Sequence, residues 1–124
     1  MLRFEIELPP VTKKNSQRLV RAKNGRIIPL PSAAYERYEK SAILMLPKLE
    51  KPIDKAVNVE AIFYMATRRK VDLVNLQEAL LDVLVKGGVL KDDCSTIVCS
   101  MDGSGVGYDK GYPRTEVWIT EVGQ

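Results

Sequence analysis

The pattern of apolar and polar positions predicts four strands along the chain. Residues 2–8 alternate between apolar and charged side chains, which is typical of a strand with one buried face. Residues 56–66 are strongly apolar and predict a central strand. Residues 94–101 and 114–122 predict two more strands, and the glycine-rich segment 102–113 between them is expected to form a flexible loop.

Two other segments carry apolar residues at helical spacing. The first follows Ser32, a good N-cap residue, and ends at Pro47. The second runs over residues 71–86 and stops at Gly87-Gly88, because glycine readily adopts the left-handed conformation that ends helices. Both apolar stripes are expected to face the core. They consist of Tyr35, Tyr38, Ala42, Met45 and Leu46 in the first helix, and of Leu73, Leu76, Leu80, Val83 and Leu84 in the second.

Residues 17–30 predict a β-hairpin. Short apolar runs flank Lys23-Asn24-Gly25-Arg26, and Asn-Gly between such runs is a strong signal for a type I′ turn. The basic residues of this segment would then lie on a projecting ribbon. Arg21 and Lys23 are two positions apart, so we expect them to share one face of it.

The order of these elements predicts a single domain over residues 1–124, of the α/β (α+β) class. We expect a mixed sheet of about four strands, two helices packed against it and a β-hairpin. No apolar stretch is long enough to cross a bilayer, and the N-terminus lacks the layout of a signal peptide. These features favour a cytoplasmic protein without membrane contact.

The composition excludes several classes of chemistry. The chain contains no histidine, which rules out Ser-His-Asp and Cys-His triads and histidine-ligated zinc. Two cysteines cannot build a structural zinc site, and Cys94 and Cys99 are expected to be reduced and buried. Catalysis would therefore use carboxylates, lysines, tyrosines or a hard metal ion, with no small-molecule cofactor expected.

Positive charge is concentrated in two clusters, although the net charge is only +3. Neither cluster contains an acidic residue, which favours a polyanionic partner over an ordinary solvated basic surface. The N-terminal basic cluster consists of Lys13, Lys14, Arg18, Arg21, Lys23 and Arg26. The second basic cluster consists of Arg68, Arg69 and Lys70.

Acidic residues flank the second predicted helix. Asp72 stands at its start, with Asn75 three positions later, and Asp92-Asp93 follow its end. Aspartate is a common N-cap and a common turn residue, so each position also has an ordinary structural explanation. If the loop after the helix folds back, however, the carboxylates would meet and could hold Mg²⁺ against a phosphodiester.

The chain resembles the RusA-type Holliday junction resolvases, a family of crossover junction endodeoxyribonucleases common in phages and prophages. The resemblance rests on Pro9-Pro10, Lys14-Asn15, Ser32 with Tyr35 and Tyr38, the second basic cluster with Asp72, Asn75-Leu76-Gln77, Ala79, Asp82, Leu84, Gly88, Asp92-Asp93, and the segment 116–121. It implies a homodimer of mixed α/β fold that binds four-way or other branched DNA. It also implies paired symmetric nicks that depend on Mg²⁺, with Mn²⁺ as a substitute, in DNA recombination and repair.

The resemblance also assigns the site residues. Of the family's three essential aspartates, the first falls on Asp72 and the last on Asp93, whereas the middle one falls on Val74. The family's essential lysine falls on Glu78. Glu78 could supply the missing carboxylate, although it stands roughly 9 Å along the helix from Asp72. Lys86 or Lys91 could supply the missing positive charge.

Three hypotheses follow. The first is an active resolvase with a rearranged acidic site, in which Asp72 and Asp93 bind the metal, and Glu78, Asp92 and Asn75 assist. The second is a branched-DNA-binding protein with impaired catalysis. The third is a basic protein-interaction module with no affinity for DNA. Under the first two, phosphates would be bound by Lys13, Lys14, Asn15, Arg18, Arg21, Lys23, Arg26, Arg68, Arg69 and Lys70.

Overall fold

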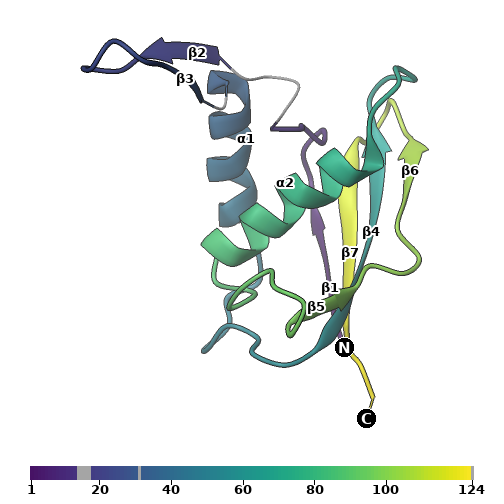
Figure 1. The fold of residues 1–124 in the computed structure, drawn as a ribbon. Coiled ribbons are helices and arrows are strands. Elements are labelled where there is room, and N and C mark those ends of the chain that lie inside the picture. The colour runs from purple at the N-terminus through teal and green to yellow at the C-terminus, as the bar shows by residue number, and fades with distance from the viewer. Residues whose placement is uncertain (14–17, 31, 124) are drawn as a thin grey trace.

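Two helices cover one face of a five-stranded sheet, and a separate hairpin extends from this body (Figure 1). The computed structural model describes residues 1–13, 18–30 and 32–123. The predicted single-domain α+β class is confirmed. The elements are β1 (Leu2–Ile6), β2 (Arg18–Arg21), β3 (Ile27–Leu30), α1 (Ala33–Leu44), β4 (Val57–Met65), α2 (Leu73–Lys86), β5 (Val98–Ser100), β6 (Gly105–Tyr108) and β7 (Arg114–Glu121).

The sheet is mixed and centred on β7 and β4. β1 pairs antiparallel with β7, and β7 pairs antiparallel with β4. On its other side, β4 pairs in parallel first with β5, near Val57, and then with β6, from Ile62 to Met65. This edge of the sheet is therefore made of two short strands that follow one another along β4.

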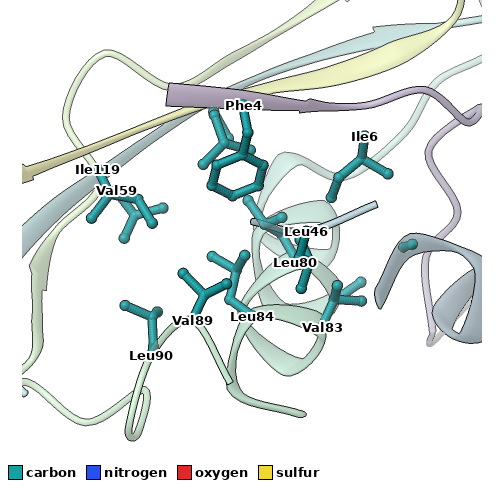
Figure 2. Close-up of a cluster of buried hydrophobic side chains, with 14 of the residues drawn as sticks. Phe4, Ile6, Leu46, Val59, Leu80, Val83, Leu84, Val89, Leu90 and Ile119 are labelled. Carbon is teal, nitrogen blue, oxygen red and sulfur yellow. The ribbon is translucent and has the colours of Figure 1, made fainter. Parts of the chain in front are cut away.

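The core lies between the sheet and the helices. Alternate residues of β4 are buried, from Val57 to Phe63, because one face of the strand meets α2. Figure 2 shows Leu80, Val83 and Leu84 of α2 pointing toward Phe4 and toward the inner face of the sheet. Burying these side chains contributes roughly 1.5–3 kcal/mol each, so the α2–sheet contact is a major source of the stability of the fold.

The helix boundaries follow from their caps. Ser32 Oγ accepts a hydrogen bond from the Tyr35 N–H at 3.1 Å, which confirms the predicted start of α1. Gly88 has a φ of +79° and ends α2 as expected. The prediction that Met45 belongs to the buried stripe of α1 is wrong. Met45 is the C-cap of α1 and is 40% exposed, because the helix ends before this side chain would turn toward the core.

The hairpin has the predicted strands but a different turn. The Gly25 N–H donates to the Ala22 carbonyl, and Gly25 alone among residues 22–26 has a positive φ. A type I′ turn needs a positive φ at Asn24 as well, so this prediction is wrong. Asn24 Oδ1 instead accepts a hydrogen bond from the Arg26 N–H, which favours a three-residue loop closed by a left-handed glycine. Lys23 consequently lies in the turn rather than on a strand face with Arg21.

The C-terminal half of the sheet also corrects the sequence expectation. The strand expected at 94–101 is limited to β5, and the expected flexible loop contains β6, so the sheet has five strands rather than about four. Because Gly107 has no side chain, the Tyr64 ring lies directly against the backbone of β6. The glycine also removes the alternation of apolar and polar side chains by which the other strands could be recognised. Asn58 holds the connection, since its Oδ1 accepts hydrogen bonds from Ser100 Oγ and the Asp102 N–H.

The two cysteines are free thiols near the edge of the sheet. Cys94 and Cys99 are unpaired, but both are exposed, so the expectation of buried thiols is wrong. Cys99 lies in β5 at the sheet edge, and Cys94 lies in the turn that precedes this strand. Within the described residues, no helix has the length and apolar character needed to span a membrane.

The connection before β6 provides a test of the fold. Gly103 has a φ of +86°, and an added Cβ would lie 2.8 Å from the Glu60 carboxyl carbon. Gly103→Ala is therefore expected to lower the free energy of unfolding by about 1–2 kcal/mol in urea titrations. Gly105→Ala is the matched control, since a Cβ there meets nothing within 4 Å. Equal stability of the two variants would contradict this account of the β5–β6 connection.

Candidate functional site

Asp72 is presented at the point where the sheet leads into α2. It is the N-cap of α2, and its Oδ1 accepts a hydrogen bond from the Val74 N–H at 3.0 Å. Its side chain is exposed, and Val74 beside it is 64% exposed. The N-terminus of a helix favours a nearby negative charge, and this carboxylate is accessible from solvent.

Asp92 and Asp93 lie beyond the other end of α2. After Gly88 the chain turns toward the segment before β4, where Leu90 bridges Ile53 and the Lys91 N–H donates to the Ile53 carbonyl. Asp92 Oδ1 accepts a hydrogen bond from the Asp93 N–H at 2.8 Å, and both side chains are exposed. The pair therefore lies in the irregular segment that leads toward β5.

The two ends of α2 keep Asp72 and Asp93 apart. Asp72 follows the Met65 end of β4, whereas Asp93 precedes β5, which pairs with the Val57 end. α2 contains 14 residues, a rise of about 21 Å. The condition under which the carboxylates would meet, a loop that folds back along α2, is therefore not fulfilled in this chain, because the loop after the glycine pair pairs with Ile53. Across residues 1–13, 18–30 and 32–123, no three acidic or cysteine side chains form a metal-binding group.

A lysine from the N-terminal segment lies on the exposed side of α2, which the sequence did not predict. Val74, Glu78 and Asp82 are spaced four residues apart and share one helix face. Lys13 Nζ lies 2.9 Å from Asp82 Oδ2, and this hydrogen bond raises the pKa of the lysine, with weaker contributions from Glu39 and Glu78. The 69 positions between the two partners leave no local sequence signal for this pair.

The lysines considered as replacements for the missing positive charge have other carboxylate partners. Lys86 lies in the last turn of α2, and its Nζ is 3.1 Å from both carboxylate oxygens of Glu39 in α1. Lys91 Nζ lies 3.1 Å from Asp54. Both stand at the end of α2 away from Asp72, so neither compensates for the glutamate at position 78 within the same chain.

Comparison with known proteins identifies the family. A family model described as Endodeoxyribonuclease RusA matches residues 7–120. The chain belongs to the RusA endodeoxyribonuclease family. The crossover junction endodeoxyribonuclease RusA of Aquifex aeolicus (strain VF5) is 32% identical over 95 residues, which cover 75% of this chain and 74% of that protein. The resemblance seen in the sequence is confirmed, and the RusA match includes both aspartates and both basic clusters.

The second basic cluster adjoins the Asp72 end of this RusA-family fold. Arg68, Arg69 and Lys70 are exposed in the connection between β4 and α2. The Arg68 guanidinium lies 4.1 Å from the centre of the Tyr108 ring, a stacking contact that ties the connection to β6. Positive charge therefore flanks Asp72, as a phosphate-binding site requires.

The N-terminal basic cluster is divided between two places. Arg21, Lys23 and Arg26 are exposed on the hairpin, whereas Lys13 is paired with Asp82 on α2. Lys14 and Asn15 lie outside the described residues, as does the Arg18 side chain. Asn75, also named from the RusA resemblance, is partly buried one turn after Asp72, beside the buried Leu76.

The capping bond of Asp72 permits a test that separates its structural role from its chemical role. Asparagine caps helices as well as aspartate does, whereas alanine cannot accept the Val74 N–H. Asp72→Ala is expected to lower the free energy of unfolding by about 1 kcal/mol in urea titrations, and Asp72→Asn by only a few tenths. A loss of 1 kcal/mol or more in both variants would mean that the charge itself stabilises the fold.

Proposed function

We propose that this chain is an Mg²⁺-dependent endonuclease that resolves Holliday junctions, or other branched DNA, by paired symmetric nicks. The observation that carries the proposal is that a RusA-family chain presents Asp72 exposed at a helix N-terminus, directly after the second basic cluster. The A. aeolicus relative is named a crossover junction endodeoxyribonuclease, which fits this substrate. The proposed setting is DNA recombination and repair in the cytoplasm.

The separation of Asp72 and Asp93 favours a homodimer. If both residues are ligands of one ion, a chain that holds them a helix length apart cannot supply the site alone. Two-fold pairing can place Asp72 of one chain beside Asp93 of the other, and it creates two equivalent sites. A four-way junction offers two equivalent strands, so two such sites match the substrate.

Once two chains bring them together, the exposed aspartates fit a hard divalent cation. Exposed carboxylates are the ligands that Mg²⁺ and Mn²⁺ prefer, and Asp72, Asp93 and the adjacent Asp92 provide them. Bound Mg²⁺ would supply Lewis-acid activation of the phosphodiester and of water. The chain's own contribution is to hold the phosphate with Arg68, Arg69 and Lys70 and to fix the Asp72 carboxylate through its capping hydrogen bond.

A second candidate function rests on a specific departure from the family pattern. Val74 occupies the position of the family's middle aspartate and is exposed beside Asp72, and Glu78 occupies the position of the essential lysine. These residues favour a branched-DNA-binding protein whose nuclease is weak. The third hypothesis, a protein-interaction module, has no comparable support, because the matched family is one of endodeoxyribonucleases.

Subunit mixing tests the active dimer. Asp72→Asn and Asp93→Asn are each expected to abolish nicking of a labelled four-way junction in Mg²⁺ or Mn²⁺, because each removes one ligand from both sites. Mixing the two variants creates heterodimers in which one site has both carboxylates and the other has neither. Each heterodimer is therefore expected to nick one strand of the junction. The nicking activity that returns after mixing is limited by the fraction of protein present as heterodimers.

The controls distinguish the alternatives. A mixture that stays inactive, although each variant still retards the junction in a gel, would place both ligands in one chain or in separate sites. Retardation without nicking by the unmodified protein would favour the second function. In that case Val74→Asp combined with Glu78→Lys is expected to raise the nicking rate at least tenfold, since it restores a ligand and a cation at the site.

A further inference from the structure

The β2–β3 hairpin exposes large apolar side chains that none of the residues described by the structure covers. Leu19 is 73% exposed and Ile27 is 61% exposed, and Val20 and Ile28 are exposed as well. β2 and β3 pair only with each other among the described strands, and Figure 1 shows the hairpin extending past the start of α1, away from the sheet. A cluster of exposed apolar side chains on a projecting ribbon marks an interaction surface.

The strand register combines these apolar side chains with positive charge. Arg21 lies directly opposite Ile27, so the two side chains share a face, and Leu19 lies two residues from Arg21 on that same face. Lys23 and Arg26 are exposed at the tip beyond it. One face of the hairpin therefore presents the apolar side chains of Leu19 and Ile27 together with the cation of Arg21. The tip of the hairpin adds the exposed cations of Lys23 and Arg26.

The charges on the molecule favour DNA over a second copy of the chain as the partner. No acidic residue occurs between Glu7 and Glu36, so the hairpin and its flanks match a polyanion. Three acidic side chains on or beside the open face of the sheet are engaged with the chain's own groups. Tyr112 donates to Glu5, and Arg114 pairs with Asp109 and Glu116.

We propose that this hairpin is a wedge for the branch point of DNA. Leu19 and Ile27 contact bases left unstacked at the branch, while Arg21, Lys23 and Arg26 bind the phosphates on either side. Apolar side chains that enter between bases must overcome stacking, and this costs least where stacking is already interrupted. The hairpin thus confers preference for branched over linear DNA. This inference rests on the proposed function, but the metal site plays no part in it.

The test measures binding without metal, so that nicking does not interfere. Leu19→Thr combined with Ile27→Thr removes apolar surface and keeps β-branched side chains suited to a strand. Val122→Thr is the matched control, since Val122 is exposed directly after β7, and its N–H donates to the Ala56 carbonyl rather than to the hairpin. Affinity is measured for a four-way junction and for a linear duplex of equal length at one salt concentration, and 2-aminopurine at the branch reports unstacking.

The double variant is expected to bind the junction at least about tenfold more weakly, with unchanged affinity for the linear duplex and without the increase in 2-aminopurine fluorescence. The Val122→Thr control is expected to match the unmodified protein. Unchanged junction affinity of the double variant would overturn the proposal. So would a change from dimer to monomer on sedimentation, because the hairpin would then contact a second copy. An unmodified protein that binds both DNAs equally would contradict the preference for branched DNA, and with it both the wedge and the proposed function.

Discussion

The contact between α2 and the sheet is the interaction on which the rest of the structure depends. Leu76, Leu80 and Leu84 are buried on one side of α2, and they cover the inner face formed by β4, β7 and β1. This contact fixes the direction of α2, and with it the positions of everything attached to its two ends. Asp72 is held at the end of β4 where the basic connection emerges, and Asp93 is held where the sheet edge begins at β5. The stability of the core and the separation of the acidic residues therefore have the same physical cause.

Much of the fold could be predicted from local sequence. The alternation in β1, the strongly apolar run of β4 and the capping residues Ser32 and Asp72 each indicated the right element, because the signal lies within a few neighbouring residues. β6 could not be recognised this way, since Gly105 and Gly107 carry no side chains from which a pattern could be read. Its pairing depends on β4, which lies more than forty residues earlier in the sequence.

The site was predictable in its parts but not in its arrangement. Asp72, Asp93 and the basic clusters could be named from the family pattern, whereas the direction of the chain after Gly88 depends on the bridge between Ile53 and Leu90. The pairing of Lys13 with Asp82 likewise joins segments with no local relation. This ion pair neutralises one positive charge of the N-terminal basic cluster. Among the residues of that cluster whose side chains the structure describes, the exposed cations are Arg21, Lys23 and Arg26. The bridge between Ile53 and Leu90 shifts the proposed function from a single-chain metal site to one shared between chains.

The most direct test of this account is a crystal structure of the protein grown with Mn²⁺, in which the anomalous signal locates the ion. The account predicts an ion bound by Asp72 of one chain and by Asp93 of a second chain, with a two-fold axis relating two such sites. An ion bound only by carboxylates of one chain would contradict the account, as would an ion bound away from both Asp72 and Asp93.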